Sequence, residues 1–269
     1  MQNVRSPAVA GAFYPASAQR LSETVAGLLA PAVERVPALG VMVPHAGYVY
    51  SGGCAGATFA RVEVPGRVIL LGPNHTGRGV SLAAAAEDAW LTPLGKAAID
   101  RELLDDLVAA GAGVQVDSRA HGGEHSLEVE VPFLLALRPQ VRLAPVVVGT
   151  HARGALAALG RALAEVARRC EPRPLIVVSS DMTHYEPADT ARAKDERALA
   201  RLAALDPEGL LDVVTAERIT MCGVAPAVAA LFALRELGAR GGELVSYTHS
   251  GMVTGDDAEV VAYAGMIFA

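Results

Sequence analysis

The sequence predicts one α/β domain over residues 1–269, with a mixed central sheet flanked by helices. Expected helices and strands alternate along the whole chain, and no linker, repeat or low-complexity tract divides it. Three of the expected strands are continuous apolar runs that lead into polar turns bearing a histidine. Hydrophobic residues make up 52% of the chain and charged residues 19%, a balance typical of a globular protein with a substantial core.

The amino-terminal half begins with a turn-rich segment and then alternates helices and strands. Apolar residues recur at helical spacing over 21–29, and either Ser17 or Ser22 could cap this helix. Ser51 is the expected cap of a small-residue helix that runs to Ala60. The other elements expected here are strands over 41–44, 67–71 and 97–99, an apolar segment over 79–86, a turn over 92–95, and a helix over 100–110 that Gly111 closes.

The carboxyl-terminal half continues the same alternation and closes with two strands. A polar, glycine-containing loop over 117–126 leads into it. The expected elements are helices over 126–137, 153–169, 188–205 and 207–215, a helix introduced by 220–223 that runs to 237, and strands over 141–148, 175–179, 243–248 and 259–268.

Charge and hydropathy exclude several classes of partner. The formal net charge is −6 and the pI about 5.7, which argues against nucleic acid or an anionic membrane as an obligatory partner. No apolar run reaches the roughly 18 residues that a membrane span needs, and the first residues lack the apolar core of a signal peptide. We therefore expect no nucleic acid and no membrane partner, and a cytoplasmic location.

Histidines follow three of the buried strands. His45 comes after the strand at 41–44, His75 after the strand at 67–71, and His184 after the strand at 175–179. In open α/β sheets ligands bind outside the carboxyl ends of the strands. The three strand ends are therefore expected to converge on one pocket, although they lie far apart in the sequence.

His45, His75 and Cys222 are candidate ligands of a metal ion. Imidazole and thiolate bind redox-active and Lewis-acidic metals, and three protein ligands leave positions open for a substrate. Cys222 precedes an expected helix, whose amino end stabilises a thiolate. Taken singly, each histidine could instead be a hydrogen-bonded structural residue, and Cys222 a buried, inert cysteine.

Two carboxylate–imidazole pairs are candidates for proton transfer. Asp181 and His184 share one polar turn, where the carboxylate could orient the imidazole for general acid or base catalysis. Glu124 and His125 offer a similar pairing, with a hydrogen-bonded loop scaffold as the alternative. A serine hydrolase is disfavoured because the chain has no GxSxG motif.

Five ordered motifs resemble those of the Memo family, whose prokaryotic members are called AmmeMemoRadiSam system protein B. The resemblance extends from residues 11–14 to 263–265. The motifs are Pro44-His45-Ala46-Gly47-Tyr48-Val49-Tyr50-Ser51-Gly52, Leu71-Gly72-Pro73-Asn74-His75, Glu124-His125-Ser126-Leu127-Glu128, Ser179-Ser180-Asp181-Met182-Thr183-His184 and Thr220-Met221-Cys222-Gly223.

The resemblance implies a fold shared with class III extradiol ring-cleavage dioxygenases, which hold non-haem iron with two histidines and a glutamate. By motif, His45 and His75 correspond to the two histidine ligands, His184 corresponds to the acid/base histidine, and Cys222 stands in the place of the third ligand. A thiolate is a softer ligand that favours copper(I) and alters the potential of iron.

The resemblance also implies a choice of functions. The first is a metal-binding redox protein, with iron or copper as cofactor and zinc as a further candidate, acting on a small-molecule substrate. The alternative is a non-catalytic binding protein whose vestigial dioxygenase site recognises a peptide, a small ligand or a partner such as the co-encoded AmmeMemoRadiSam proteins.

Overall fold

Four parallel strands form the centre of one mixed sheet. The computed structural model describes residues 3–30 and 34–269. In the order β2, β9, β3, β8, neighbouring central strands pair in parallel, and almost all of their residues are buried. Their bounds are Gly40–Val43 for β2, Leu175–Ser179 for β9, Arg67–Pro73 for β3 and Arg142–Val148 for β8.

Shorter strands extend the sheet on both sides. Beside β8 lie β6 (Gly95–Ile99), β5 (Ala89–Thr92) and β1 (Val4–Arg5), and β4 (Leu82–Ala84) pairs with the end of β8 and with β7 (Gln115–Val116). Beside β2 the long strand β12 (Val260–Phe268) runs antiparallel and also pairs with β11 (Gly242–His249) and β10 (His184–Glu186). The predicted mixed sheet is therefore confirmed.

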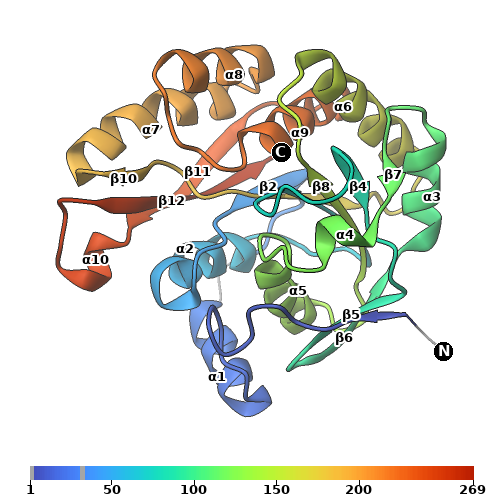
Figure 1. Ribbon diagram of the computed structural model, residues 1–269, viewed down its shortest axis with the longest axis horizontal. Coiled ribbons are helices and arrows are strands. Elements are labelled where there is room, and N and C mark those ends of the chain that lie inside the picture. The colour runs from blue at the N-terminus through green and yellow to red at the C-terminus, as the bar shows by residue number, and fades with distance from the viewer. Residues whose placement is uncertain (1–2, 31–33) are drawn as a thin grey trace.

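Helices cover both faces of the sheet. One face carries α3 (Arg101–Ala109), α6 (Arg153–Arg168) and α9 (Val224–Leu237), and the other carries α1 (Ala18–Leu28), α2 (Tyr48–Ala60) and α5 (Val131–Leu137). Figure 1 shows α1, α2 and α5 in the lower half of the molecule, and α7 (Ala188–Ala203) and α8 (Pro207–Ala216) packed together in the upper half. The short helices α4 (Ser118–His121) and α10 (Gly251–Thr254) lie in connections.

Two glycines in the sheet show why α9 and α2 can pack so closely against it. A Cβ at Gly40 would lie 3.0 Å from Leu234 of α9, and a Cβ at Gly265 would collide with Thr58 of α2. The two glycines point to opposite faces, because Gly40 pairs with Phe268, three residues beyond Gly265. The sheet is therefore covered on both sides. In the described ranges no helix has the length and apolar character that a membrane span needs.

The predicted elements are largely confirmed, with two corrections. Ser17 caps α1 as predicted. The helix expected after Ser51 begins at Tyr48 instead, with Gly47 at its N-cap, because the Ser51 hydroxyl donates to the Ala46 carbonyl from inside the first turn.

The second correction concerns the helix expected over 126–137. A 3-10 turn at Glu128–Glu130 precedes an α-helix that begins only at Val131. Pro132 lies in the first turn of that helix, where its missing N–H is tolerated.

Candidate metal site

The carboxyl ends of β3, β9 and β2 lie side by side, because the three strands are parallel neighbours with β9 in the middle. His75 follows β3, Asp181 follows β9 and His45 follows β2, each by two residues. The imidazole centroids of His45 and His75 are 5.2 Å apart, and the His45 N–H donates to Asp181 Oδ1 at 2.8 Å. The strand ends therefore meet. Of the three strand-end histidines expected to converge, His45 and His75 belong to the close group of the described residues and His184 does not.

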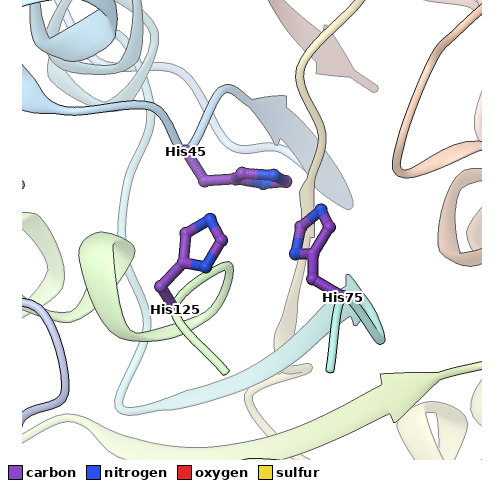
Figure 2. A group of neighbouring side chains, drawn as sticks. All are labelled: His45, His75 and His125. Carbon is purple, nitrogen blue, oxygen red and sulfur yellow. The ribbon is translucent and has the colours of Figure 1, made fainter. Parts of the chain in front are cut away.

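His125 joins the two strand-end histidines from the loop between α4 and the turn at 128–130. Its ring stacks on that of His75 at 4.8 Å and lies 5.6 Å from that of His45. In the part of the chain that the structure describes, the three histidines form a group whose potential ligand atoms all lie within 4.8 Å of one another. Figure 2 shows the three rings pointing toward a common space.

His45 is held so that Nε2 faces Cys222. Its Nδ1 lies 2.8 Å from Ser179 Oγ, and its Nε2 lies 3.3 Å from Cys222 Sγ. The ring is almost completely buried, and burial lowers the pKa of His45 well below its usual range. The imidazole is therefore neutral, the form that binds metals.

His75 is oriented by Glu124. Its Nδ1 lies 2.9 Å from Glu124 Oε1, and its main-chain N–H donates to Oε2 at 2.6 Å. Burial acts to raise the pKa of Glu124, but hydrogen bonds from His75 and from the N–H of Ser126 outweigh it and lower the pKa to about 2. The ionised carboxylate accepts a hydrogen bond from the Nδ1–H of His75, which leaves the Nε2 lone pair available to a metal.

The predicted pairing of Glu124 with His125 is secondary. His125 Nδ1 lies 3.7 Å from the carboxylate, beyond hydrogen-bond distance, because the oxygens of Glu124 are engaged by His75. The ring of Phe13 also packs against His125, with the ring centroids 4.8 Å apart. His125 therefore packs against His75, a potential metal ligand, and is not hydrogen-bonded to Glu124.

Cys222 lies in the turn just before α9, as predicted. Burial raises the pKa of the Cys222 thiol and outweighs the N–H of Gly223 at the helix amino end, which acts to lower that pKa, in the expected direction. Its Sγ accepts the N–H of Asp181 at 3.2 Å. A bound metal ion would remove the thiol proton, since coordination deprotonates a thiol.

Asp181 does not orient His184, in contrast to the prediction. Nδ1 of His184 lies 3.0 Å from the carbonyl of Thr220, so in the neutral ring this nitrogen carries the proton and Nε2 carries the lone pair. The Asp181 carboxylate instead accepts main-chain N–H groups at His45 and Ala46. Burial raises the pKa of Asp181 to about 7 despite these hydrogen bonds.

The donor set fits a metal ion in chemistry, and one of its distances also fits in geometry. Bond lengths of 2.0–2.3 Å and a tetrahedral angle place a nitrogen and a sulfur ligand about 3.6 Å apart, close to the 3.3 Å between His45 Nε2 and Cys222 Sγ. Three nitrogens bound at 2.0–2.1 Å to one ion lie about 3.4–3.6 Å apart. The potential ligand atoms of the three-histidine group, which lie within 4.8 Å of one another, would therefore have to approach by up to about 1.4 Å to share one ion.

Three residues support the histidines in a way that the sequence did not predict. The sequence alone predicts no role as a histidine partner for Ser179, Thr220 or Glu130. Ser179 and Thr220 lie within the motifs that drew attention to the site, but a hydroxyl or carbonyl partner of a histidine leaves no pattern in the sequence. Glu130 lies outside those motifs and reaches His45 only through Ser179.

The fold and this site define an α/β protein with a histidine- and cysteine-lined centre at the carboxyl ends of parallel strands. The family model described as Memo-like protein matches residues 5–267, so the chain belongs to the Memo-like family.

Relatives of similar length support this assignment. A MEMO1 family protein of Aquifex aeolicus (strain VF5) is 43% identical over 267 residues, covering 98% of this chain and 99% of its own. A MEMO1 family protein of Methanopyrus kandleri is 38% identical over 278 residues, covering 98% of each chain. Among solved structures, the uncharacterized protein JW3007 from Escherichia coli K12 is similar in fold, with a TM-score of 0.52 at 13% identity over 84% of this chain and 98% of that one.

Proposed function

We propose that this protein binds one iron or copper ion through His45, His75 and Cys222, with His125 as a fourth donor beside them. The observation that carries the proposal is the three-histidine group at the carboxyl ends of adjacent strands, with a thiol 3.3 Å from one imidazole. Zinc fits the same donors and is the alternative ion.

The chain's own residues would supply orientation and proton transfer. Glu124 and Ser179 bind Nδ1 of His75 and His45, which leaves the lone pair of each ring on Nε2, and the Thr220 carbonyl does the same for His184. A bound iron or copper ion would supply redox chemistry toward a small-molecule substrate. His184 would then hold or move a proton at Nε2, which gives an oxidoreductase related to the extradiol dioxygenases.

Metal analysis of untagged protein tests this proposal. We expect close to one iron or copper ion per chain, and loss of the metal in His45→Ala and Cys222→Ala. Comparison of His125→Ala with Cys222→Ala identifies the third ligand, since the weaker donor costs less affinity. Protein that takes up neither metal on anaerobic reconstitution would refute the proposal and favour a binding protein for a peptide, a small ligand or a co-encoded partner. A cytoplasmic location belongs to the same proposal.

A further inference from the structure

Glu130 is a buried carboxyl group that the proposed function does not use. Its residue is completely buried beneath the site, at the end of the 3-10 turn. Within the described residues Oε1 contacts Ser179 Oγ at 3.0 Å and Oε2 has no hydrogen-bond partner. An ionised carboxylate with one hydrogen bond and no cation beside it would be very costly in this position, so Glu130 is a neutral acid.

The hydrogen bonds around Ser179 can be assigned by counting protons. Ser179 Oγ has one proton and three neighbours: the Ser126 carbonyl at 2.6 Å, His45 Nδ1 at 2.8 Å and Glu130 Oε1 at 3.0 Å. The carbonyl can only accept, so the single proton of Ser179 belongs to it. His45 and Glu130 must therefore both donate to Ser179.

We propose that Glu130 is a positioning residue for His45, a permanently protonated acid that donates to Ser179 and so keeps Ser179 an acceptor of the His45 Nδ1 proton. The imidazole is thereby fixed as the tautomer whose Nε2 lone pair faces Cys222. This inference rests on the proposed function in one respect: the proposed function makes the Nε2 lone pair of His45 a metal ligand.

The two histidines thus have unlike supports. His75 donates to the ionised carboxylate of Glu124, whereas His45 donates to a neutral hydroxyl backed by a neutral acid. The burial that isolates Glu130 also raises the pKa of its carboxyl well above its usual range, in agreement with the geometric argument.

Infrared and NMR spectra of the metal-free protein test the assignment without any bound ion. The infrared difference between wild type and Glu130→Gln at pH 7 should contain the carbonyl stretch of a protonated carboxylic acid. Ser179→Ala should move that band to higher frequency, because the acid loses its acceptor. Long-range ¹H–¹⁵N spectra, assigned with His45→Gln, should show the Nδ1–H tautomer of His45. Loss of a carboxylate band instead, or an Nε2–H tautomer, would overturn the proposal.

Cobalt(II) titration then compares the two supports. We expect Glu124→Gln and Ser179→Ala to weaken Co²⁺ binding by about 10- to 100-fold, the range found for partners of metal-bound histidines. Glu130→Gln, whose amide is neutral and can donate like the acid, should weaken it by no more than about threefold. An effect of Glu130→Gln equal to that of Glu124→Gln would refute a neutral role. If wild type binds neither Co²⁺ nor iron or copper, the metal proposal fails while the two spectra still decide the role of Glu130.

Discussion

Replacing Arg5 by methionine should destabilise the loop over residues 121–128, because Arg5 connects that loop to strand β1. Arg5 and Glu128 form a buried ion pair at 2.7 Å, with side chains only 3% and 1% exposed. The same guanidinium donates to the carbonyls of His121 at 2.8 Å and Glu124 at 2.7 Å, and lies 4.6 Å from the centroid of the Trp90 ring. Arg5 thus holds both sides of the turn that carries the carboxylate orienting His75.

The expected loss can be worked out from what the substitution leaves behind. Glu128 would keep three donors, the N–H groups of Ala8 and Val9 and the hydroxyl of Tyr14, but would lose the one cation that it contacts among the described residues. Breaking a buried ion pair by removing one partner costs about 3–5 kcal/mol. Two carbonyl groups also lose their charged donor, while the methionine side chain replaces part of the packing, so we expect a total near the middle of that range.

Urea denaturation of the metal-free protein at pH 7 measures this loss. A double-mutant cycle of Arg5→Met and Glu128→Gln should give a coupling free energy of at least about 2 kcal/mol, since the two groups touch. Arg5→Lys is the matched control: it keeps the charge but cannot serve three acceptors with one planar fork. A loss below about 1 kcal/mol for Arg5→Met, or effects that simply add, would refute the reasoning.

Three further substitutions test other parts of the structure. Gly223→Ala should abolish uptake of metal in an anaerobic titration, because its Cβ would lie 2.6 Å from Ser180 Oγ and would push Cys222 out of place; unchanged uptake would contradict this. Asp195→Asn should remove a pH dependence, because burial raises the Asp195 pKa to about 6. At low pH the native state binds one extra proton at Asp195, so the stability of wild type relative to Asp195→Asn should fall by roughly 3 kcal/mol as the pH rises from about 4 to above 6. An equal change with pH in the unfolding free energies of both proteins, measured with urea, would disprove this. Phe13→Ala should lower Co²⁺ affinity only modestly, by about threefold to tenfold, since it frees the His125 ring without removing a ligand; no change would show that His125 takes no part.

The sequence predicted the sheet and its strand ends well because both depend on local patterns. Continuous apolar runs and the polar turns after them located β2, β3 and β9, and the histidines of two of those turns lie together in the structure. Strand order is not local, since β9 is inserted between β2 and β3 from more than 100 residues away. The sequence therefore predicted which side chains lie near the strand ends better than it predicted which of them are hydrogen-bonded to one another.

The wrong pairings have one physical cause. Neighbours in sequence, Asp181 with His184 and Glu124 with His125, were expected to be hydrogen-bond partners. Within one turn, an imidazole and a nearby carboxylate point in different directions. The buried carboxylate therefore accepts hydrogen bonds from donors that the tertiary fold brings close. Glu124 is satisfied by His75, 49 residues away, and Asp181 by the main chain of His45, 136 residues away.

Charge balance explains why the two histidine supports should differ. In the proposed state with a divalent ion, the Cys222 thiolate and the Glu124 carboxylate together neutralise the metal. A further ionised carboxylate at Glu130, fully buried behind Ser179, would leave a net negative charge in a region from which water is excluded. Burial likewise raises the pKa of Asp181 to about 7, because exclusion of water disfavours an ionised carboxylate there too. A neutral acid behind His45 and an ionised one behind His75 therefore orient both ligands while adding only one charge, and Glu130→Gln is the substitution that separates orientation from charge.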